Sequence, residues 1–413
     1  MNNVHFIMHT VILKKMLIFI VLILLCVGFF IFTSEDSKLN EQLISKLYKK
    51  NDEIPKNENI AYSIIGITAP QDVNNIHKYG QSLIEEALRN SEEIIDNKVP
   101  NITPFDNELK IRNNSEKDIC WWELDRIIGD DNESCMSERE KHILLIDNNI
   151  LLSRYMSLHK YARIRVNVPL SRNDNLIIPL HNIFLAYINK LSVLNNSVLV
   201  QELLLNDIRL WRSLASEKVS WIDKLIFLNV LLDDLKMLKV LLGNDKNHIN
   251  NYEELRAVIE PLGVSNWAIG DSYILELKLS ELRFCLDEGF DYPSAESCLD
   301  KIESMFFKKN MTVNKIYDHI DELLMLSMST PEKISQSCAE ASEKKRMSIM
   351  GWLNQYLFNY KGHQLYKHYT DYSSKTNLCN ILKLINLTDN YFVEINEQLL
   401  GRSNKVAKGD GSI

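Results

Sequence analysis

The chain contains little glycine and little proline, 13 and 9 residues among 413. Sandwiches of β-sheets and doubly wound α/β folds need many turn residues, so this scarcity favours long helices joined by short connections. The alternation of apolar and polar residues that marks a half-buried strand is nearly absent, with RIRVNV at Arg163–Val168 as the main exception. The composition therefore predicts an all-α fold.

Several motifs of enzymes and nucleotide-binding proteins are also missing. The sequence has no G-x-S-x-G, no G-x-x-x-x-G-K-[ST], no G-x-G-x-x-G and no H-E-x-x-H. The nearest histidine pair, His363 and His368, would be turned about 140° apart on a helix. Two carboxylate pairs, Asp130–Asp131 in a turn and Asp233–Asp234 on a helix, are interpreted as solvated. No catalytic, cofactor-binding or metal-binding residue is predicted.

Charge is absent from Met16 to Thr33, a run of eighteen residues. As a helix this run spans about 27 Å, close to the thickness of the hydrocarbon layer of a bilayer. Lys14 and Lys15 precede it, and Glu35 and Asp36 follow it. Basic flanks stay in the cytoplasm, so we expect a cytoplasmic N-terminus and an external remainder.

The predicted span lacks the features of a cleaved signal peptide. It ends in Phe29–Phe32 instead of small residues, and Leu24–Leu25 stand where lipoprotein cleavage before Cys26 would need small ones. We therefore expect an uncleaved anchor in which Cys26 faces lipid. The next most apolar stretch, Trp221–Gly243, carries six charged residues and is expected to be a buried helix of the soluble part.

These features predict five regions. They are a short cytoplasmic N-terminus (1–15), a transmembrane helix (16–33), a juxtamembrane stalk and linker (34–58), an irregular helical domain outside the cytoplasm (59–400) and a disordered tail (401–413). Without Lys14 and Lys15 the net charge of −8 becomes −10, and this acidity argues against nucleic acid as a partner.

The predicted topology places most of the cysteines outside the cytoplasm. Six of the seven lie beyond the anchor, and an even number in an oxidising compartment suits disulfide bonds: Cys120, Cys135, Cys285, Cys298, Cys338 and Cys379. Cys120 and Cys135 flank a strong turn at Gly129–Asn132, and closing this loop would stabilise the fold by about 3 kcal/mol. Cys285 is expected to pair with Cys298, and elimination leaves Cys338 with Cys379. A zinc site at Cys120 and Cys135 is the alternative, but no C-x-x-C is present and His142 is the only histidine nearby.

Periodic apolar residues predict a series of helices. A capping box, Ser137–Glu140, opens one that continues to Leu158. The others are expected at 76–88, 176–194, 198–214, 221–242, 252–259, 267–286, 295–308, 313–328, 332–358 and 377–399. No fixed repeat period is found, so an irregular helical domain is preferred to a solenoid.

Four segments resemble predicted proteobacterial inner-membrane proteins that have one anchor and a helical periplasmic domain. They are NIAYSIIGITAP (59–70), LLSRYMSL (151–158), LLNDIRLWRSL (204–214) and NMTVNKIY (310–317). The resemblance covers about a tenth of the chain. It implies location in the bacterial inner membrane with the bulk of the chain in the periplasm, and it implies no activity.

Our first hypothesis is therefore a membrane-anchored envelope protein without catalytic activity, whose periplasmic domain binds a protein or a component of the cell wall. One alternative is an envelope hydrolase with a site assembled from Glu123, Asp125, His142 and Arg154. Another is a eukaryotic type II membrane protein, for which six asparagines match the glycosylation pattern: Asn101, Asn113, Asn132, Asn195, Asn310 and Asn386.

Overall fold

The computed structural model describes residues 54–93, 108–112, 136–161, 163–164, 174–217, 219–243, 252–261 and 372–409, with single positions at 16, 19–23, 41, 267, 272, 325, 333 and 336. This described part is 81% helical and has no strand. Its extended residues form one isolated bridge, between Asn59 and Arg163. The all-α prediction is confirmed for the described part of the chain.

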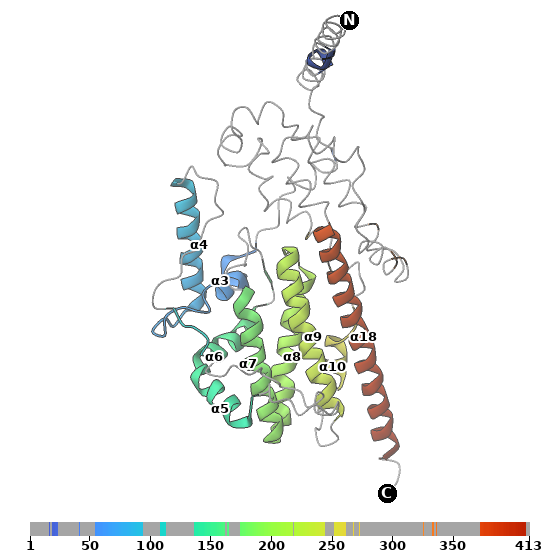
Figure 1. Cartoon of the computed structure of the whole chain (residues 1–413). Coiled ribbons are helices and arrows are strands. Elements are labelled where there is room, and N and C mark those ends of the chain that lie inside the picture. Colours follow the sequence, from blue (N-terminus) through green and yellow to red (C-terminus); the bar gives the residue numbers. More distant parts are fainter. Residues whose placement is uncertain are drawn as a thin grey trace, which may run out of the picture. The chain divides into compact units, whose positions relative to one another are not determined.

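The chain divides into two compact units, and nearly every described residue belongs to the unit of residues 49–280, 320–341 and 375–413. Its centre is formed by three long helices, α7 (Asp174–Val193), α8 (Ser197–Ser216) and α9 (Trp221–Gly243), each packed against the other two. Figure 1 shows them side by side. All three begin and end within a few residues of the predicted bounds, and α9 is buried along most of its length, as expected.

The connection between α8 and α9 is held by a buried lysine. Lys224, in the first turn of α9, donates from Nζ to the carbonyl oxygens of Ala215 at 2.7 Å, Glu217 at 3.1 Å and Trp267 at 2.6 Å. The last carbonyls of a helix have no partner within it, so an ammonium group at the end of α8 satisfies them and meets the negative end of the helix dipole. The Lys224 side chain is wholly buried, so these bonds account for its charge in the core.

The helix predicted from Ser137 to Leu158 is broken into two. Its capping box is present at the start of α5 (Glu138–Asp147), but α6 (Asn149–Ser157) begins after a kink at Asn148. The Asn148 amide group exchanges two hydrogen bonds with the backbone of Arg112, both of 2.9 Å. The Asn148 amide also donates to the Leu144 carbonyl oxygen at 2.8 Å, so it caps the end of α5 as well as binding a segment 36 residues away. A short 3₁₀ turn, η3 (Leu158–Lys160), continues α6.

The C-terminal helix packs on the same unit. Lys239 of α9 pairs with Glu394 of α18 (Tyr372–Gly409) at 2.6 Å, and the Arg212 guanidinium of α8 lies over the Phe392 ring. The shorter helix α10 (Tyr252–Val258) contacts α8. Helix α18 is longer than predicted and runs through Gly401 into the segment expected to be a disordered tail. One glycine inside a helix costs only about 1 kcal/mol, and helix-forming residues follow it.

The N-terminal helices α3 (Ile60–Ile65) and α4 (Ile76–Glu93) cross with their backbones in contact. A Cβ atom on Gly66 would lie 1.9 Å from the carbonyl oxygen of Ile76, and one on Gly80 would lie 1.8 Å from that of Tyr62. No side chain fits at either position, so the crossing requires glycine on both sides.

We expect Gly80→Ala to separate α3 from α4 and to cost about 3 kcal/mol or more in the free energy of unfolding, because backbone atoms cannot move aside as a side chain can. Urea unfolding followed by circular dichroism measures this cost. Gly243→Ala is the matched control, since nothing lies within 4 Å of the Cβ it would add. Equal stability of the two variants would contradict the required close approach.

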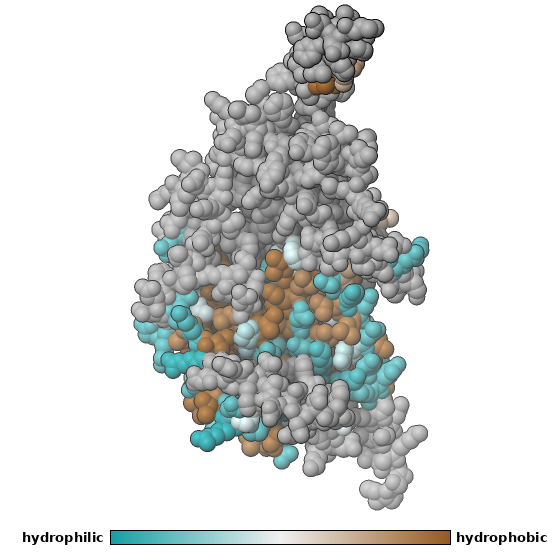
Figure 2. Space-filling model, viewed as in Figure 1, coloured by the Kyte–Doolittle hydropathy of each residue, from teal (hydrophilic) through white to brown (hydrophobic). Residues whose placement is uncertain are grey.

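The predicted anchor is described at Met16 and Phe19–Ile23 alone, which are helical, so the span as a whole stays a prediction. Within the described residues, the helix window long and apolar enough to cross a membrane is Leu176–Val193 in α7. Half of that window is buried inside the protein, and the core helix of a soluble domain passes the same test. Hydrophobic and hydrophilic residues are both visible on the surface in Figure 2. The helices predicted between 267 and 358 lie outside the described residues, apart from single positions.

Candidate functional site

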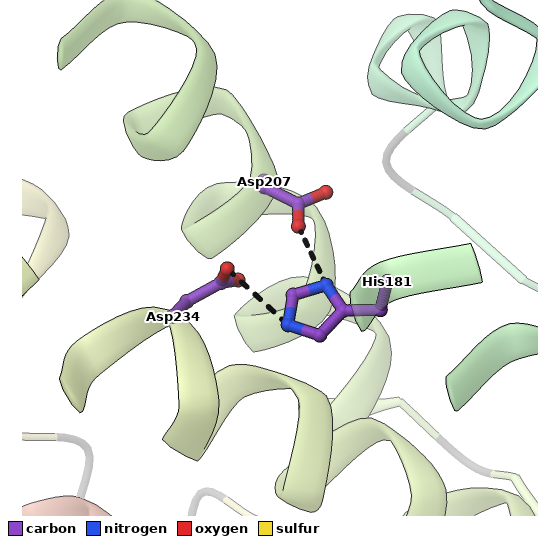
Figure 3. Close-up of side chains that lie close together, drawn as sticks. All are labelled: His181, Asp207 and Asp234. Carbon is purple, nitrogen blue, oxygen red and sulfur yellow. Dashed lines mark ion pairs between the residues drawn. The ribbon is translucent and has the colours of Figure 1, made fainter. Parts of the chain in front are cut away.

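A cluster of three ionisable side chains lies in the centre of the helical unit. His181 comes from α7, Asp207 from α8 and Asp234 from α9, and their exposed fractions are 1%, 0% and 0%. One potential ligand atom of each lies within 4.8 Å of those of the other two. Figure 3 shows the His181 ring between the two carboxylates, with one ring nitrogen directed at each. Charged groups are rarely placed so deep without a specific arrangement of partners.

Asp207 is the acceptor at the middle of this arrangement. Its Oδ1 lies 2.8 Å from His159 Nε2 and accepts from Trp211 Nε1 at 3.1 Å. Its Oδ2 accepts from the Tyr155 hydroxyl at 3.0 Å and lies 3.2 Å from His181 Nδ1. Both oxygens therefore have two partners, and the hydrogen-bonding capacity of the carboxylate is used.

Asp234 has the opposite environment. Its Oδ1 lies 3.6 Å from His181 Nε2, which is too long for a hydrogen bond. Neither Asp234 oxygen has a hydrogen-bond partner, and neither does His181 Nε2. A buried carboxylate and a buried imidazole nitrogen thus face each other across a short gap.

The sequence places these residues on the core faces of their helices. In α8, Asp207 lies one turn from Leu204 and Trp211, both buried. His181 likewise lies one turn before Phe184 in α7, and Asp234 lies one turn after Leu231 in α9. The apolar residues on the same helical stripes carry the polar ones into the core when the helices pack.

Aromatic rings close the cluster on one side. Tyr155 of α6 lies 5.4 Å from Phe184 and 6.1 Å from Trp211, measured between ring centroids. The Tyr155 hydroxyl also accepts a hydrogen bond of 2.8 Å from Trp211 Nε1. Among the residues of this network that the structure describes, His159 has a side chain that is 10% exposed. The surroundings strengthen electrostatic interactions inside the cluster because they exclude water.

The two carboxylates have opposite pKa shifts. Burial by itself would raise the pKa of Asp207, but hydrogen bonds from His159 and His181 and the charges of these rings lower it to about 2. Burial raises the pKa of Asp234 well above its ordinary value, and the nearby charges of Asp207 and Asp233 add to this effect. The pKa of Tyr155 is also raised, first by burial and then by Asp207 and Asp234. Asp207 is thus the ionised member, while Asp234 is destabilised as a free anion.

This geometry suits two kinds of chemistry. In the first, a metal ion lies between His181 and Asp234 and compensates the carboxylate charge. In the second, the carboxyl group of Asp234 stays protonated and the cluster is a buried polar network. The unpartnered atoms on both sides of the gap are available as metal ligands.

The cysteines and hydrolase residues that the sequence singles out are not part of this cluster within the described part of the chain. Cys379 is buried on α18 and disulfide-bonded, whereas its partner and the other predicted cysteines lie outside the described residues, so the pairings stay predictions. Within the described part, the proposed hydrolase residues are not brought together. His142 lies 2.8 Å from Lys190 Nζ at the surface, and Arg154 serves another purpose. Glu123 and Asp125 lie outside the described residues.

The Arg154 guanidinium holds the loop between α3 and α4. It donates to the carbonyl oxygens of Ile67 at 3.1 Å, Pro70 at 2.8 Å and Val73 at 3.1 Å, and also to that of Ala69. Burial lowers the pKa of Arg154. With its donors bound to backbone, this side chain is a structural clamp and is not available as the catalytic group of the hydrolase alternative.

Sequence motifs do not reveal the cluster, and the expectation for one of its residues is wrong. The sequence predicts that Asp234 is solvated, yet it is wholly buried, while its neighbour Asp233 reaches solvent and pairs with Lys236. The missed signal was a charged residue in register with an apolar helical stripe, as at Asp207 and Asp234. Two of the four segments of the family resemblance contain residues of the network: 151–158 contains Tyr155, and 204–214 contains Asp207 and Trp211.

Comparisons with known proteins add no relative to this description. The chain matches no protein-family model, no curated protein and no solved structure.

Proposed function

We propose that the helical unit binds one divalent transition-metal ion of the zinc type between His181 of α7 and Asp234 of α9. The observation that supports the proposal is the gap of 3.6 Å between His181 Nε2 and Asp234 Oδ1, both buried and both without a hydrogen-bond partner. Leaving such atoms unpaired in a core is costly, and a shared cation removes the cost.

The size of the gap suits a zinc-type ion. Zinc lies about 2.0–2.1 Å from an imidazole nitrogen and about 2.0–2.2 Å from a carboxylate oxygen. His181 Nε2 and Asp234 Oδ1 are 3.6 Å apart, so an ion at these distances from both would have an N–metal–O angle of about 120°. This angle is near the tetrahedral value, so little movement of either side chain is needed.

The donor set also limits the class of ion. One imidazole nitrogen with carboxylate oxygens suits Zn²⁺, Co²⁺ and related first-row ions. Calcium takes six to eight oxygen ligands, and magnesium keeps several waters in an octahedral shell. The cluster offers only two carboxylates, and Asp207 already accepts from four groups. Magnesium and calcium are therefore expected not to bind.

Metal binding is tested on the full-length chain after treatment with a chelator and removal of the chelator. We expect Zn²⁺, and not Mg²⁺, to bind in a 1:1 ratio by elemental analysis and to raise the melting temperature by roughly 3 °C or more at saturating concentration. His181→Ala should lose both responses. His142→Ala is the control, because His142 lies at the surface beside Lys190. The proposal would be refuted if the wild-type chain retains no zinc. It would also be refuted if His181→Ala binds as much zinc as the wild type.

A second proposal concerns where the helical unit is located. We propose that residues 16–33 anchor the chain in the bacterial inner membrane, with the N-terminus in the cytoplasm and the bulk of the chain in the periplasm, and that the external part binds a protein or a cell-wall component. The observation in its favour is that Met16 and Phe19–Ile23 are helical and apolar with exposed fractions of 46–64%. A helix that exposes so many apolar side chains needs an apolar surrounding such as a bilayer.

Reporter fusions at Ile413 test this topology. We expect a phosphatase that is active only outside the cytoplasm to be active in the fusion, because two lysines on the N-terminal side of the span keep that side inside. Lys14→Glu with Lys15→Glu should weaken or scramble the orientation. A fusion that is active only with a cytoplasmic reporter would overturn the topology and the expectation of disulfides that rests on it.

A further inference from the structure

The protonation of the His181 ring can be worked out from its partners. The Tyr155 hydroxyl carries one proton and donates it to Asp207 Oδ2 at 3.0 Å. The same hydroxyl accepts from Trp211 Nε1 at 2.8 Å, because an indole N–H can only donate. Tyr155 therefore has no proton left for His181 Nδ1, which lies 2.9 Å from its oxygen.

His181 Nδ1 faces the Tyr155 oxygen and Asp207 Oδ2, and neither oxygen has a proton to donate to it. The proton in this contact is therefore carried by Nδ1. This nitrogen lies 2.9 Å from the Tyr155 oxygen and 3.2 Å from Asp207 Oδ2, and both oxygens are acceptors toward it. A lone pair on Nδ1 would be directed at a carboxylate and would be repelled. If Nδ1 carries the hydrogen, the neutral ring has its lone pair on Nε2, on the side of Asp234.

From this geometry we infer that Asp207 is a positioning residue for the metal site, because it holds His181 in the tautomer whose Nε2 lone pair faces Asp234. This inference rests on the proposed metal binding. A histidine that binds a metal commonly donates its other N–H to a carboxylate, which fixes both tautomer and ring orientation. Asp207 would have this role without being a ligand itself.

An asparagine at position 207 would reverse the tautomer. Its single oxygen must stay on the side of His159 and Trp211, because the Trp211 N–H needs an acceptor. Its amide nitrogen would then face Tyr155 and His181 and would donate to Nδ1. The ring proton would move to Nε2, and the nitrogen that faces Asp234 could no longer bind a metal. The side chain changes only in its hydrogen-bonding pattern and keeps nearly the same shape.

The test uses the full-length chain labelled with ¹⁵N-histidine, in metal-free form. The His181 signals are assigned by their loss in His181→Gln. We expect Nδ1 to carry the hydrogen in the wild type and in Tyr155→Phe, which leaves Asp207 in place, and Nε2 to carry it in Asp207→Asn. Titration with Zn²⁺ should give an affinity lower by about 10- to 100-fold in Asp207→Asn. If Asp207 had a merely structural role, its substitution would not move the proton of the His181 ring from Nδ1 to Nε2.

Each outcome decides the inference separately from metal binding. A wild-type ring with the hydrogen on Nε2 or on both nitrogens would overturn it, and so would an Asp207→Asn protein that keeps the wild-type tautomer. If Asp207→Asn does not fold, the wild type and Tyr155→Phe still decide the tautomer. A wild type with the expected tautomer and no zinc would refute the proposed function alone, since the tautomer is read without metal.

Discussion

Asp234→Asn is expected to stabilise the metal-free protein at neutral pH while it removes the response to zinc. The Asp234 carboxyl group is wholly buried and its oxygens have no hydrogen-bond partner. The group therefore destabilises the metal-free wild type whether it is ionised or protonated. An asparagine carries no charge, and its amide can donate toward the lone pair on His181 Nε2. We expect a gain on the order of 1–3 kcal/mol in the free energy of unfolding without metal.

The pH dependence of this effect has a definite sign. Because burial raises the pKa of Asp234 in the folded protein, the group binds its proton more tightly there than in the unfolded chain. Its favourable contribution is complete below the unfolded pKa of about 3.8 and is lost as pH rises through the folded pKa. Asp207, with its pKa lowered to about 2, contributes stability above pH 3.8 that is lost as pH falls toward 2.

Urea unfolding at several pH values, with and without zinc, measures both parts of this prediction. Asp233→Asn is the matched control: the neighbouring carboxylate is 24% exposed and pairs with Lys236, so its removal should change stability by less than about 1 kcal/mol and leave the zinc response intact. If Asp234→Asn lowers the stability of the metal-free protein, the carboxylate has a favourable partner in the apo state and the metal hypothesis loses its main support.

Lys224→Met is expected to cause the largest loss of stability, about 3–5 kcal/mol. Methionine keeps much of the length of the lysine side chain but removes the ammonium group. The carbonyl oxygens of Ala215, Glu217 and Trp267 would each lose a donor within 3.1 Å, and the bonds to Ala215 and Trp267 are buried. The connection from α8 to α9 would lose the group that fixes it.

The loss should appear in urea unfolding and as faster hydrogen exchange at the end of α8. Lys236→Met on the same helix is the control, because Lys236 is partly exposed and its pair with Asp233 contributes less than about 1 kcal/mol. Similar stabilities of the two variants would mean that the three carbonyls find other donors, and the role given to Lys224 would be wrong.

The sequence predicts the helices of this protein well where burial alone determines them. The bounds of α8 and α9 follow from the dense apolar residues of each helix, most of which are buried in the fold. The prediction fails at Asn148, where α5 ends and the amide group binds the backbone of the distant Arg112. Local periodicity contains no information about a partner 36 residues away.

The candidate site is harder to predict for the same reason. His181, Asp207 and Asp234 stand on three helices and have no motif spacing, so only the packing of α7, α8 and α9 brings them together. A polar residue on an apolar stripe was visible at each position, but on a single helix such a residue is more often near the surface. The sequence therefore limits the site to a few candidates and leaves the pairing to the fold.

The direct bond between Trp211 and Asp207 provides an optical reporter of the buried cluster. Indole fluorescence depends on the polarity and charge around the ring, and here the ring nitrogen donates to the carboxylate that holds His181. The chain has six tryptophans, and replacing the other five by phenylalanine would leave Trp211 as the only indole emitter. Its emission would then follow cobalt binding by quenching and the assembly of α6, α7 and α8 during refolding, without any attached dye.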